Sequence, residues 1–194
     1  MLEEYLQRWN TGRTTLLCLL KKECMPKEES SEDLRSCLEL ELKKLMRCFE
    51  GKECYALDGD AIERTRSSRD GNKAQKTMDV YLFQKDTDDP LTLIECKYRI
   101  KSAQGEQSES IKKLHKEITK KVNYSSQFLM LEGRKLSTQR FVVMNSSVAA
   151  IQRFNFISYD IANNVKLPVL VVDTEELYQN LNELGLQTTS GELL

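Results

Sequence analysis

The stretch "TLIECKYRI", residues 92–100, has the pattern of a β-strand with a charged face. Successive side chains of a strand point to opposite sides of a sheet. Glu95 and Lys97 therefore share one face, and Cys96 between them lies on the other. A strand that places a carboxylate beside an ammonium group has either a solvated face or a chemical use for the pair.

A second predicted strand, "TMDVYLFQ" at residues 77–84, precedes this one across an acidic turn. Two such strands joined by a short loop are typical of a β-hairpin. The hairpin brings Asp79, near the start of the first strand, close to Glu95 in the second. The turn itself offers other aspartates, but the last of them lies only six residues before Glu95, which leaves little room for a turn and a returning strand. Asp79 is therefore preferred over Asp86, Asp88 and Asp89.

Helical patterns surround this hairpin, and further apolar runs predict additional strands. Residues 58–76 are polar and rich in turn formers, so a long loop is expected there. The order of elements predicts an α/β fold, or an α+β fold, in which a mixed β-sheet is surrounded by helices. We expect one domain over residues 1–194. Helices are expected at residues 1–24 with a break at Thr11-Gly12, at 32–50, at 106–122, between the last two strands and from 174 onward. The other strands are expected at 52–57, 140–147 and 167–173.

Composition limits the possible functions. The formal net charge of −1 means that the whole molecule does not attract nucleic acid electrostatically, so any polyanion must meet a local basic patch. No apolar run approaches the roughly 20 residues of a membrane span, and no signal peptide is evident at the charged N-terminus. Six cysteines without a C-x2-C pair, and one histidine, His115, do not predict a zinc site. Without a signal peptide or a membrane span, the chain is expected in a reducing compartment, with its cysteines as free thiols.

Asp79, Glu95 and Lys97 together form a pattern that suits phosphodiester cleavage. Two carboxylates at close range repel each other unless a proton or a cation lies between them. Mg²⁺ and Mn²⁺ prefer oxygen ligands and keep water molecules that a substrate can replace. A lysine beside such an ion can orient the attacking water or offset negative charge in the transition state. The plainer interpretation is a solvated sheet face, since Glu-x-Lys pairs are common there.

Asp79 followed by Glu95-x-Lys97 on adjacent strands resembles the PD-(D/E)xK nuclease superfamily, with Met78 where the pattern has proline. A second resemblance covers roughly residues 35–120. The segment "ELKKLMRCFEGKECYA" (41–56) is similar to a helix of the N-terminal endonuclease domain of arenavirus L proteins, and "LTLIECKYRIKS" (91–102) and "SIKKLHKEI" (110–118) are similar to its second-carboxylate strand and its basic helix. A reptile arenavirus is the expected source.

This resemblance implies a set of site residues. Glu50, Asp79 and Glu95 would bind one or two Mn²⁺ or Mg²⁺ ions, and the backbone carbonyl of Cys96 would complete the coordination. Glu41 and Glu53 are alternatives to Glu50. The mammalian arenavirus domains take their lysine from the helix that follows, whereas this chain has Lys97 at the superfamily position. We therefore assign Lys97 as catalytic and Lys113 as substrate-binding. Four more lysines of the basic helix, Lys112, Lys116, Lys120 and Lys121, are expected to be solvated and to attract phosphates.

The implied function is cap-snatching. A metal-dependent endonuclease would cut single-stranded RNA, taken from capped host messages, to prime transcription by a viral RNA-directed RNA polymerase. The chain would be the N-terminal part of that larger polymerase, monomeric as an isolated domain, without a membrane partner, and found in the host cytoplasm and the virion. Two alternatives stay open, a DNA nuclease of the same superfamily and a non-catalytic nucleic-acid-binding domain with a decayed site.

Overall fold

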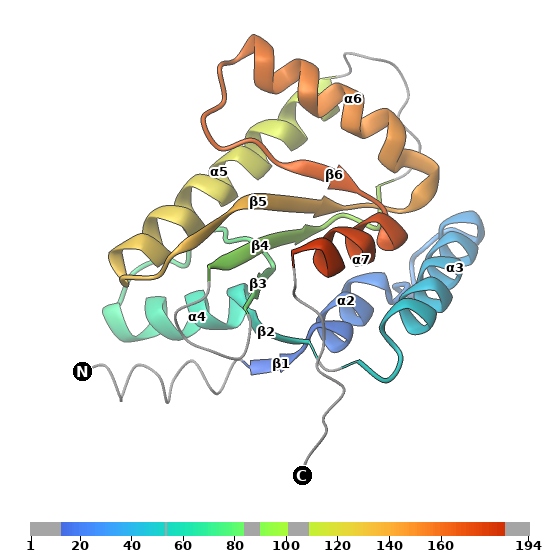
Figure 1. Ribbon diagram of the computed structural model, residues 1–194, viewed down its shortest axis with the longest axis horizontal. Coiled ribbons are helices and arrows are strands. Elements are labelled where there is room, and N and C mark those ends of the chain that lie inside the picture. Colours follow the sequence, from blue (N-terminus) through green and yellow to red (C-terminus); the bar gives the residue numbers. More distant parts are fainter. Residues whose placement is uncertain (1–12, 53, 84–89, 101–108, 185–194) are drawn as a thin grey trace.

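The computed structural model describes residues 13–52, 54–83, 90–100 and 109–184. In this part of the chain one mixed sheet has the strand order β1-β2-β3-β4-β5-β6 (Figure 1). Neighbouring strands from β1 to β4 are antiparallel, and β4, β5 and β6 are parallel. The predicted class, an α/β fold with a mixed sheet and surrounding helices, is confirmed. The strands are β1 (Arg13–Thr15), β2 (Tyr55–Asp58), β3 (Val80–Leu82), β4 (Leu91–Cys96), β5 (Leu136–Val143) and β6 (Leu170–Val172).

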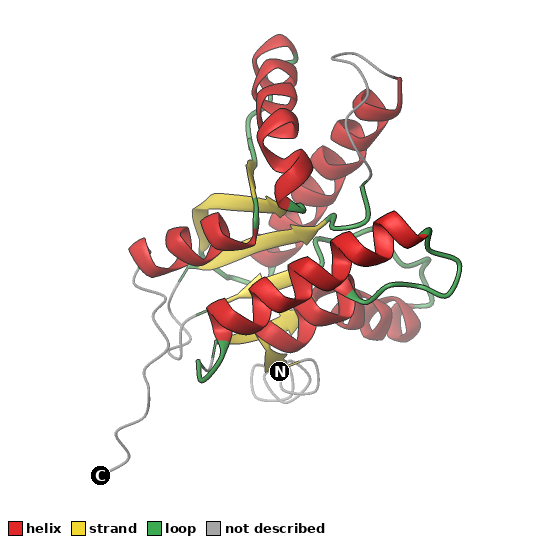
Figure 2. Ribbon diagram, turned by 90° about the vertical axis from the view of Figure 1, so that its right-hand side faces the viewer, coloured by secondary structure: helices red, strands yellow, loops and turns green. Residues whose placement is uncertain are grey.

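Helices cover both faces of the sheet, as Figure 2 shows. One apolar cluster joins α2 (Leu16–Cys24), α3 (Glu32–Phe49) and α7 (Thr174–Glu183) to the face that carries Ile94 and Cys96. A second cluster joins α5 (Glu109–Leu131) and α6 (Ser146–Ala162) to the face that carries Leu93. Burial of apolar area on both faces is what holds the three layers together.

The central hairpin has the predicted pairing. Val80 lies opposite Ile94 in an antiparallel register, so Asp79, one residue earlier, lies next to Glu95, one residue later. Strand β3 is shorter than the expected 77–84. Strand β4 ends at Cys96, but the Lys97 amide still donates to the Val143 carbonyl at 2.8 Å. The alternative aspartates of the turn, Asp86, Asp88 and Asp89, lie outside the described residues.

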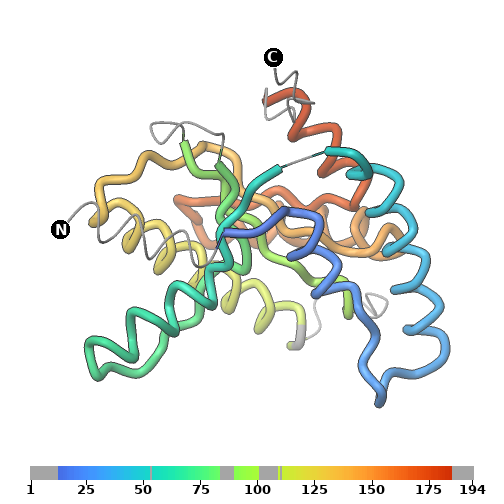
Figure 3. Tube along the Cα trace, turned by 90° about the horizontal axis from the view of Figure 1, so that it is seen from below, coloured from blue at the N-terminus to red at the C-terminus, as the bar shows by residue number. Residues whose placement is uncertain are grey.

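The prediction of a long loop at residues 58–76 is wrong, because most of this segment forms helix α4 (Gly59–Asp70). Asp58 caps this helix by accepting the Ala61 amide at 2.9 Å, and Gly71 ends it in the left-handed conformation with φ of 66°. The buried positions of α4 are Gly59, Glu63 and Ser67. A helix can be recognised from an apolar stripe in the sequence only when its buried residues are apolar. The buried residues of α4 are not apolar, so the sequence shows no such stripe. Figure 3 shows α4 and α3 at opposite ends of the molecule.

Other boundaries agree with the sequence to within a few residues, with two exceptions. Helix α5 continues nine residues past the expected end at 122, to Leu131. Residues 13–15, expected to be helical, form β1, and Thr15 then caps α2 by accepting the Cys18 amide at 3.3 Å. Residues 1–12 are outside the described part. Asp173 is the N-cap of α7 and forms a complete capping box with Glu176.

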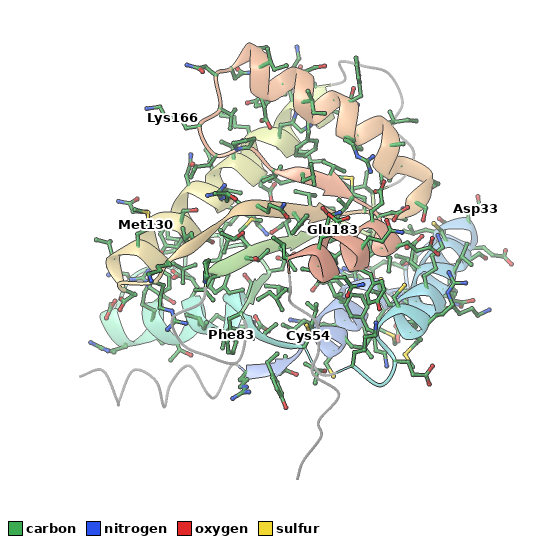
Figure 4. All side chains as sticks on the ribbon, viewed as in Figure 1. Asp33, Cys54, Phe83, Met130, Lys166 and Glu183 are labelled. Atoms are coloured by element: carbon green, nitrogen blue, oxygen red, sulfur yellow. The ribbon has the colours of Figure 1, made fainter. Side chains whose placement is uncertain are left out.

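Two general expectations can be compared with the described residues. None of the six cysteines, all of which lie in that part, is joined in a disulfide bond. No helix there is both long enough and apolar enough to cross a membrane. Side chains occupy the space between the sheet and the helices, while those of Met130 and Lys166 lie at the outer edge of the molecule (Figure 4).

Candidate metal and phosphate site

Asp79 is held at the start of the inner strand β3 by hydrogen bonds of its backbone and its side chain. It directly precedes β3, and its carbonyl accepts the Gly59 amide at 3.0 Å. Its Oδ2 atom accepts the Cys96 amide at 2.8 Å, which ties the carboxylate to the end of β4. Because a carboxylate held by a backbone N–H cannot rotate freely, Asp79 presents its other oxygen, Oδ1, toward the neighbouring charges in a defined direction.

Glu95 is the most buried carboxylate of this region, with a fully buried side chain. Its Oε1 atom accepts from Lys97, and from Lys121 at 2.6 Å. Its Oε2 atom is buried and has no hydrogen-bond partner among the described residues. Burial, together with the negative charge of Asp79, raises the pKa of Glu95 to about 7 although both lysines act to lower it. An unsatisfied carboxylate oxygen in the interior is costly, so it indicates a position that a ligand can complete.

Lys121, which the sequence analysis placed among solvated lysines, is instead part of this site. It projects from α5, its side chain is 10% exposed, and its Nζ atom lies 3.2 Å from Asp79 Oδ1 as well as 2.6 Å from Glu95. Burial acts to lower the pKa of Lys121, but the carboxylates of Glu95 and Asp79 outweigh it and raise that pKa. Helical spacing offered a signal, because Lys121 follows buried Ile118 by three residues and precedes buried Ser125 by four.

Glu23 is a second residue that the sequence analysis missed. It lies in the last turn of α2 and lines a shallow pocket with Asp79 and with Asp58 and Asp60. Burial and then the charge of Asp79 raise the pKa of Glu23. Arg99 pairs with Glu23 at 3.6 Å. The α2 helix thus brings a third carboxylate near Asp79 from the layer opposite to α5.

Most carboxylates of the pocket and the site are paired with cations of the protein, and Asp60 accepts a hydrogen bond. Lys22 pairs with Asp58 at 3.4 Å, and Thr77 donates to Asp60 at 3.0 Å. Each of Asp58, Asp79, Glu95 and Glu23 therefore has a cationic partner.

Two residues assigned from the resemblance are not brought to this site. Glu50 is the exposed C-cap residue of α3, and no hydrogen bond or ion pair among the described residues joins it to Asp79 or Glu95. Lys113 is exposed on α5 and likewise makes no described ion pair with the two carboxylates. Lys97 is where the sequence analysis put it, beside Glu95. The alternative ligand Glu53 lies outside the described residues.

Glu41, the other alternative to Glu50, is buried and holds helices together through hydrogen bonds. Its buried carboxylate accepts the Ser146 amide at 3.2 Å, the Thr174 hydroxyl at 2.7 Å and the Lys44 ammonium at 3.1 Å. These donors come from the first turns of α6 and α7 and from α3 itself. Glu41 therefore joins three helices, and its oxygens are occupied by protein donors.

His115 lies in the contact between α5 and α6. Its ring centroid is 3.7 Å from that of Phe156, and neither ring nitrogen has a hydrogen-bond partner among the described residues. Burial lowers its pKa to about 4, so the ring is neutral at pH 7.

The cluster suits a hard divalent cation in its chemistry. Asp79 and Glu95 supply oxygen ligands, one oxygen of Glu95 is unsatisfied, and a lysine ammonium already marks a cationic position between the two carboxylates. Within the described ranges no group of three or more His, Cys, Asp or Glu side chains is already close enough to hold an ion jointly. A bound ion would thus draw on Asp79 and Glu95 first, with Glu23, which lines a pocket together with Asp79, as a further carboxylate.

Comparisons of the chain with protein-family models, with curated proteins and with solved structures gave no match. The resemblance to arenavirus endonucleases therefore rests on the sequence motifs. The fold itself is α/β, with a mixed six-stranded sheet between helices in the described residues.

Proposed function

We propose that this chain is a metal-dependent endonuclease that hydrolyses phosphodiester bonds of single-stranded RNA. One observation carries the proposal: Asp79 and Glu95 meet at the end of the central hairpin, with Lys97 on the same strand face and a buried, unsatisfied oxygen on Glu95. A merely structural carboxylate pair would have its buried oxygens satisfied, as Glu41 does.

The chain's own residues would divide the work. Asp79 and Glu95 would hold Mn²⁺ or Mg²⁺, with the Cys96 carbonyl from the resemblance and Glu23 as further donors, for one or two ions. Bound there, the ion would polarise the phosphate and lower the pKa of its water ligand. The Cys96 amide fixes the orientation of Asp79, so the site's geometry is set before any substrate arrives.

Lys97 is the lysine best placed to contact the substrate. Its side chain is 21% exposed, compared with 10% for Lys121, and within the described residues its one ion pair is with Glu95. Its ammonium group can therefore turn toward a phosphate and offset the negative charge that develops there. The exposed lysines of α5 would bind the RNA backbone, and these are Lys112, Lys113, Lys116 and Lys120.

The biological role follows from the resemblance alone. As part of a viral polymerase, the domain would cut leaders from capped host messages in the host cytoplasm and so supply primers for viral transcription. A DNA nuclease of the same superfamily would use the same carboxylates and lysine, so the choice of RNA depends on this resemblance.

One observation favours a second candidate, a non-catalytic nucleic-acid-binding domain. Lys121 and Lys97 together already balance the charges of the two carboxylates, so the folded cluster needs no metal to be stable. Such a domain would keep its basic helix and bind nucleic acid without cutting it.

Cleavage of a labelled single-stranded RNA by the full chain distinguishes these candidates. The assay uses Mn²⁺, Mg²⁺ or EDTA, with single-stranded DNA of equal sequence as a second substrate. Asp79→Asn and Lys97→Ala test the site, and Lys43→Ala, at an exposed lysine of α3 away from the site, is the matched control. We expect cutting of RNA in Mn²⁺ by the wild type and the control only.

The contrary results are equally clear. Preferential cutting of DNA would move the proposal to the DNA-nuclease class. RNA binding without cutting in any metal would favour the non-catalytic domain. Cutting by Asp79→Asn at the wild-type rate would place the chemistry elsewhere.

A further inference from the structure

Lys121 has a position that Lys97 does not share. Its Nζ atom contacts one oxygen of each carboxylate, 3.2 Å from Asp79 Oδ1 and 2.6 Å from Glu95 Oε1. In the described part of the chain, the Lys97 ammonium group pairs with Glu95 and not with Asp79. Lys121 is thus a bridge between the two acids, and it reaches them from α5, an element separate from the hairpin that carries them.

A cation between two carboxylates relieves their mutual repulsion. In the metal-free protein Lys121 does this, and it does so where water is largely excluded, which strengthens both attractions. A divalent ion such as Mg²⁺ that used both carboxylates would lie about 2.0–2.1 Å from an oxygen of each, within the space that the Lys121 ammonium group occupies. An ammonium group and a divalent ion cannot both occupy the space between Asp79 and Glu95.

We propose that Lys121 is an exchangeable counter-ion: it holds Asp79 and Glu95 together in the metal-free protein and is displaced when a divalent cation binds. This inference rests on the proposed metal-dependent function. It separates the two lysines, since Lys97 then remains the group that faces the substrate while Lys121 regulates metal loading. Displacement also releases a positive charge beside the site, so metal loading strengthens binding of a phosphate backbone.

Exchange predicts that removing the Lys121 charge tightens metal binding. In the wild type, Mn²⁺ must break the hydrogen bonds from Lys121 to the two carboxylates, and each such bond to a charged group stabilises the metal-free protein. Lys121→Met lacks these bonds and should therefore bind Mn²⁺ at least about tenfold more tightly than the wild type. Lys97→Met removes one contact instead of two and should show a smaller gain. Lys120→Met, exposed one residue away on α5, should leave the affinity unchanged.

Isothermal titration of the full chain with Mn²⁺ alone measures this directly. The expected order of affinity is Lys121→Met, then Lys97→Met, then the wild type and Lys120→Met together. Equal or weaker Mn²⁺ binding by Lys121→Met, with the wild type still binding, overturns the exchange but leaves the proposed nuclease. Absence of Mn²⁺ binding by the wild type and Lys121→Met alike overturns both.

A second measurement on the wild type covers the case in which Lys121→Met fails to fold. Acetylation of individual lysines is followed by mass spectrometry, with and without Mn²⁺. Loss of its two carboxylate partners should increase the rate at which Lys121 is labelled when Mn²⁺ is added, relative to Lys120. A Lys121 rate that is unchanged or lower relative to Lys120 overturns the exchange.

Discussion

The Nζ atom of Lys121 and the Oε1 atom of Glu95 lie 2.6 Å apart and join helix α5 to strand β4 in the interior of the protein. A buried ion pair contributes little net stability, because desolvation of both charges offsets their attraction. Loss of one partner is costly, since the other charge stays buried alone. The pair is therefore better explained as part of a charged site than as a stabilising device.

Asp79→Asn should remove stabilisation by metal while the fold is kept. The asparagine can still accept the Cys96 amide, but it lacks the charge that a divalent ion requires. At a hundredfold excess over Kd, Mn²⁺ should stabilise the wild type by about 2.7 kcal/mol, which is roughly 5–10 °C in Tm for a chain of this size. Thermal unfolding with Mn²⁺ and with EDTA measures the gain. Asp70→Asn, at an exposed helix end, is the control, and an equal gain in Asp79→Asn would refute the assignment.

Glu23→Gln and Glu50→Gln separate the carboxylate found in the structure from the one implied by the resemblance. Glu23 lines the same pocket as Asp79, whereas Glu50 is an exposed helix cap. We expect Glu23→Gln to weaken Mn²⁺ binding by about tenfold, the loss of one charged ligand contact, and Glu50→Gln to leave it unchanged. Calorimetric titration decides between them, and the reverse order would restore Glu50 as a ligand.

Gly59→Ala should destabilise the protein by about 2 kcal/mol or more, as overpacking of a closed contact does. A Cβ atom at Gly59 would lie 2.1 Å from the Met78 carbonyl oxygen, next to the backbone that positions Asp79. Gly71→Ala is the matched control, because its left-handed φ costs about 1 kcal/mol while its surroundings are open. Urea unfolding compares them, and a larger loss in Gly71→Ala would contradict the prediction.

His115 should make the protein less stable in acid. Its pKa is about 4 in the folded protein and 6.5 in the unfolded chain, so its contribution is complete above pH 6.5. As pH falls from 6.5 toward 4, the unfolded chain binds a proton that the folded protein does not, and stability decreases by roughly 2 kcal/mol between pH 7 and pH 5.

Glu95 acts in the opposite direction, because its raised pKa lets the folded protein bind a proton first. The comparison is therefore between the wild type and His115→Leu, by urea unfolding in EDTA at pH 7 and pH 5. His115 is the only histidine of the chain, so the difference isolates its titration. A difference that does not change with pH would mean that the ring accepts a proton in place.

The central hairpin could be predicted from the sequence because its determinants are local. Alternation with period two and a turn-forming segment fix which residues of a hairpin face each other. Asp79, Glu95 and Lys97 can therefore be placed together from the sequence, with Cys96 on the opposite face of its strand. Helix α4 could not be predicted from an apolar stripe, because its buried face carries the polar residue Glu63. The Glu63 carboxylate accepts hydrogen bonds from Arg66 and Tyr124.

The α/β class, the mixed sheet and the pairing that joins Asp79 to Glu95 follow from local patterns in the sequence. Which helices complete the site depends on tertiary packing. Lys121 and Glu23 lie 26 residues after Glu95 and 56 residues before Asp79, and they meet these carboxylates because α5 and α2 pack on opposite faces of the sheet. Packing of apolar faces sets how a helix docks, so a charged residue beside an apolar stripe reaches its partners through contacts that no local pattern encodes.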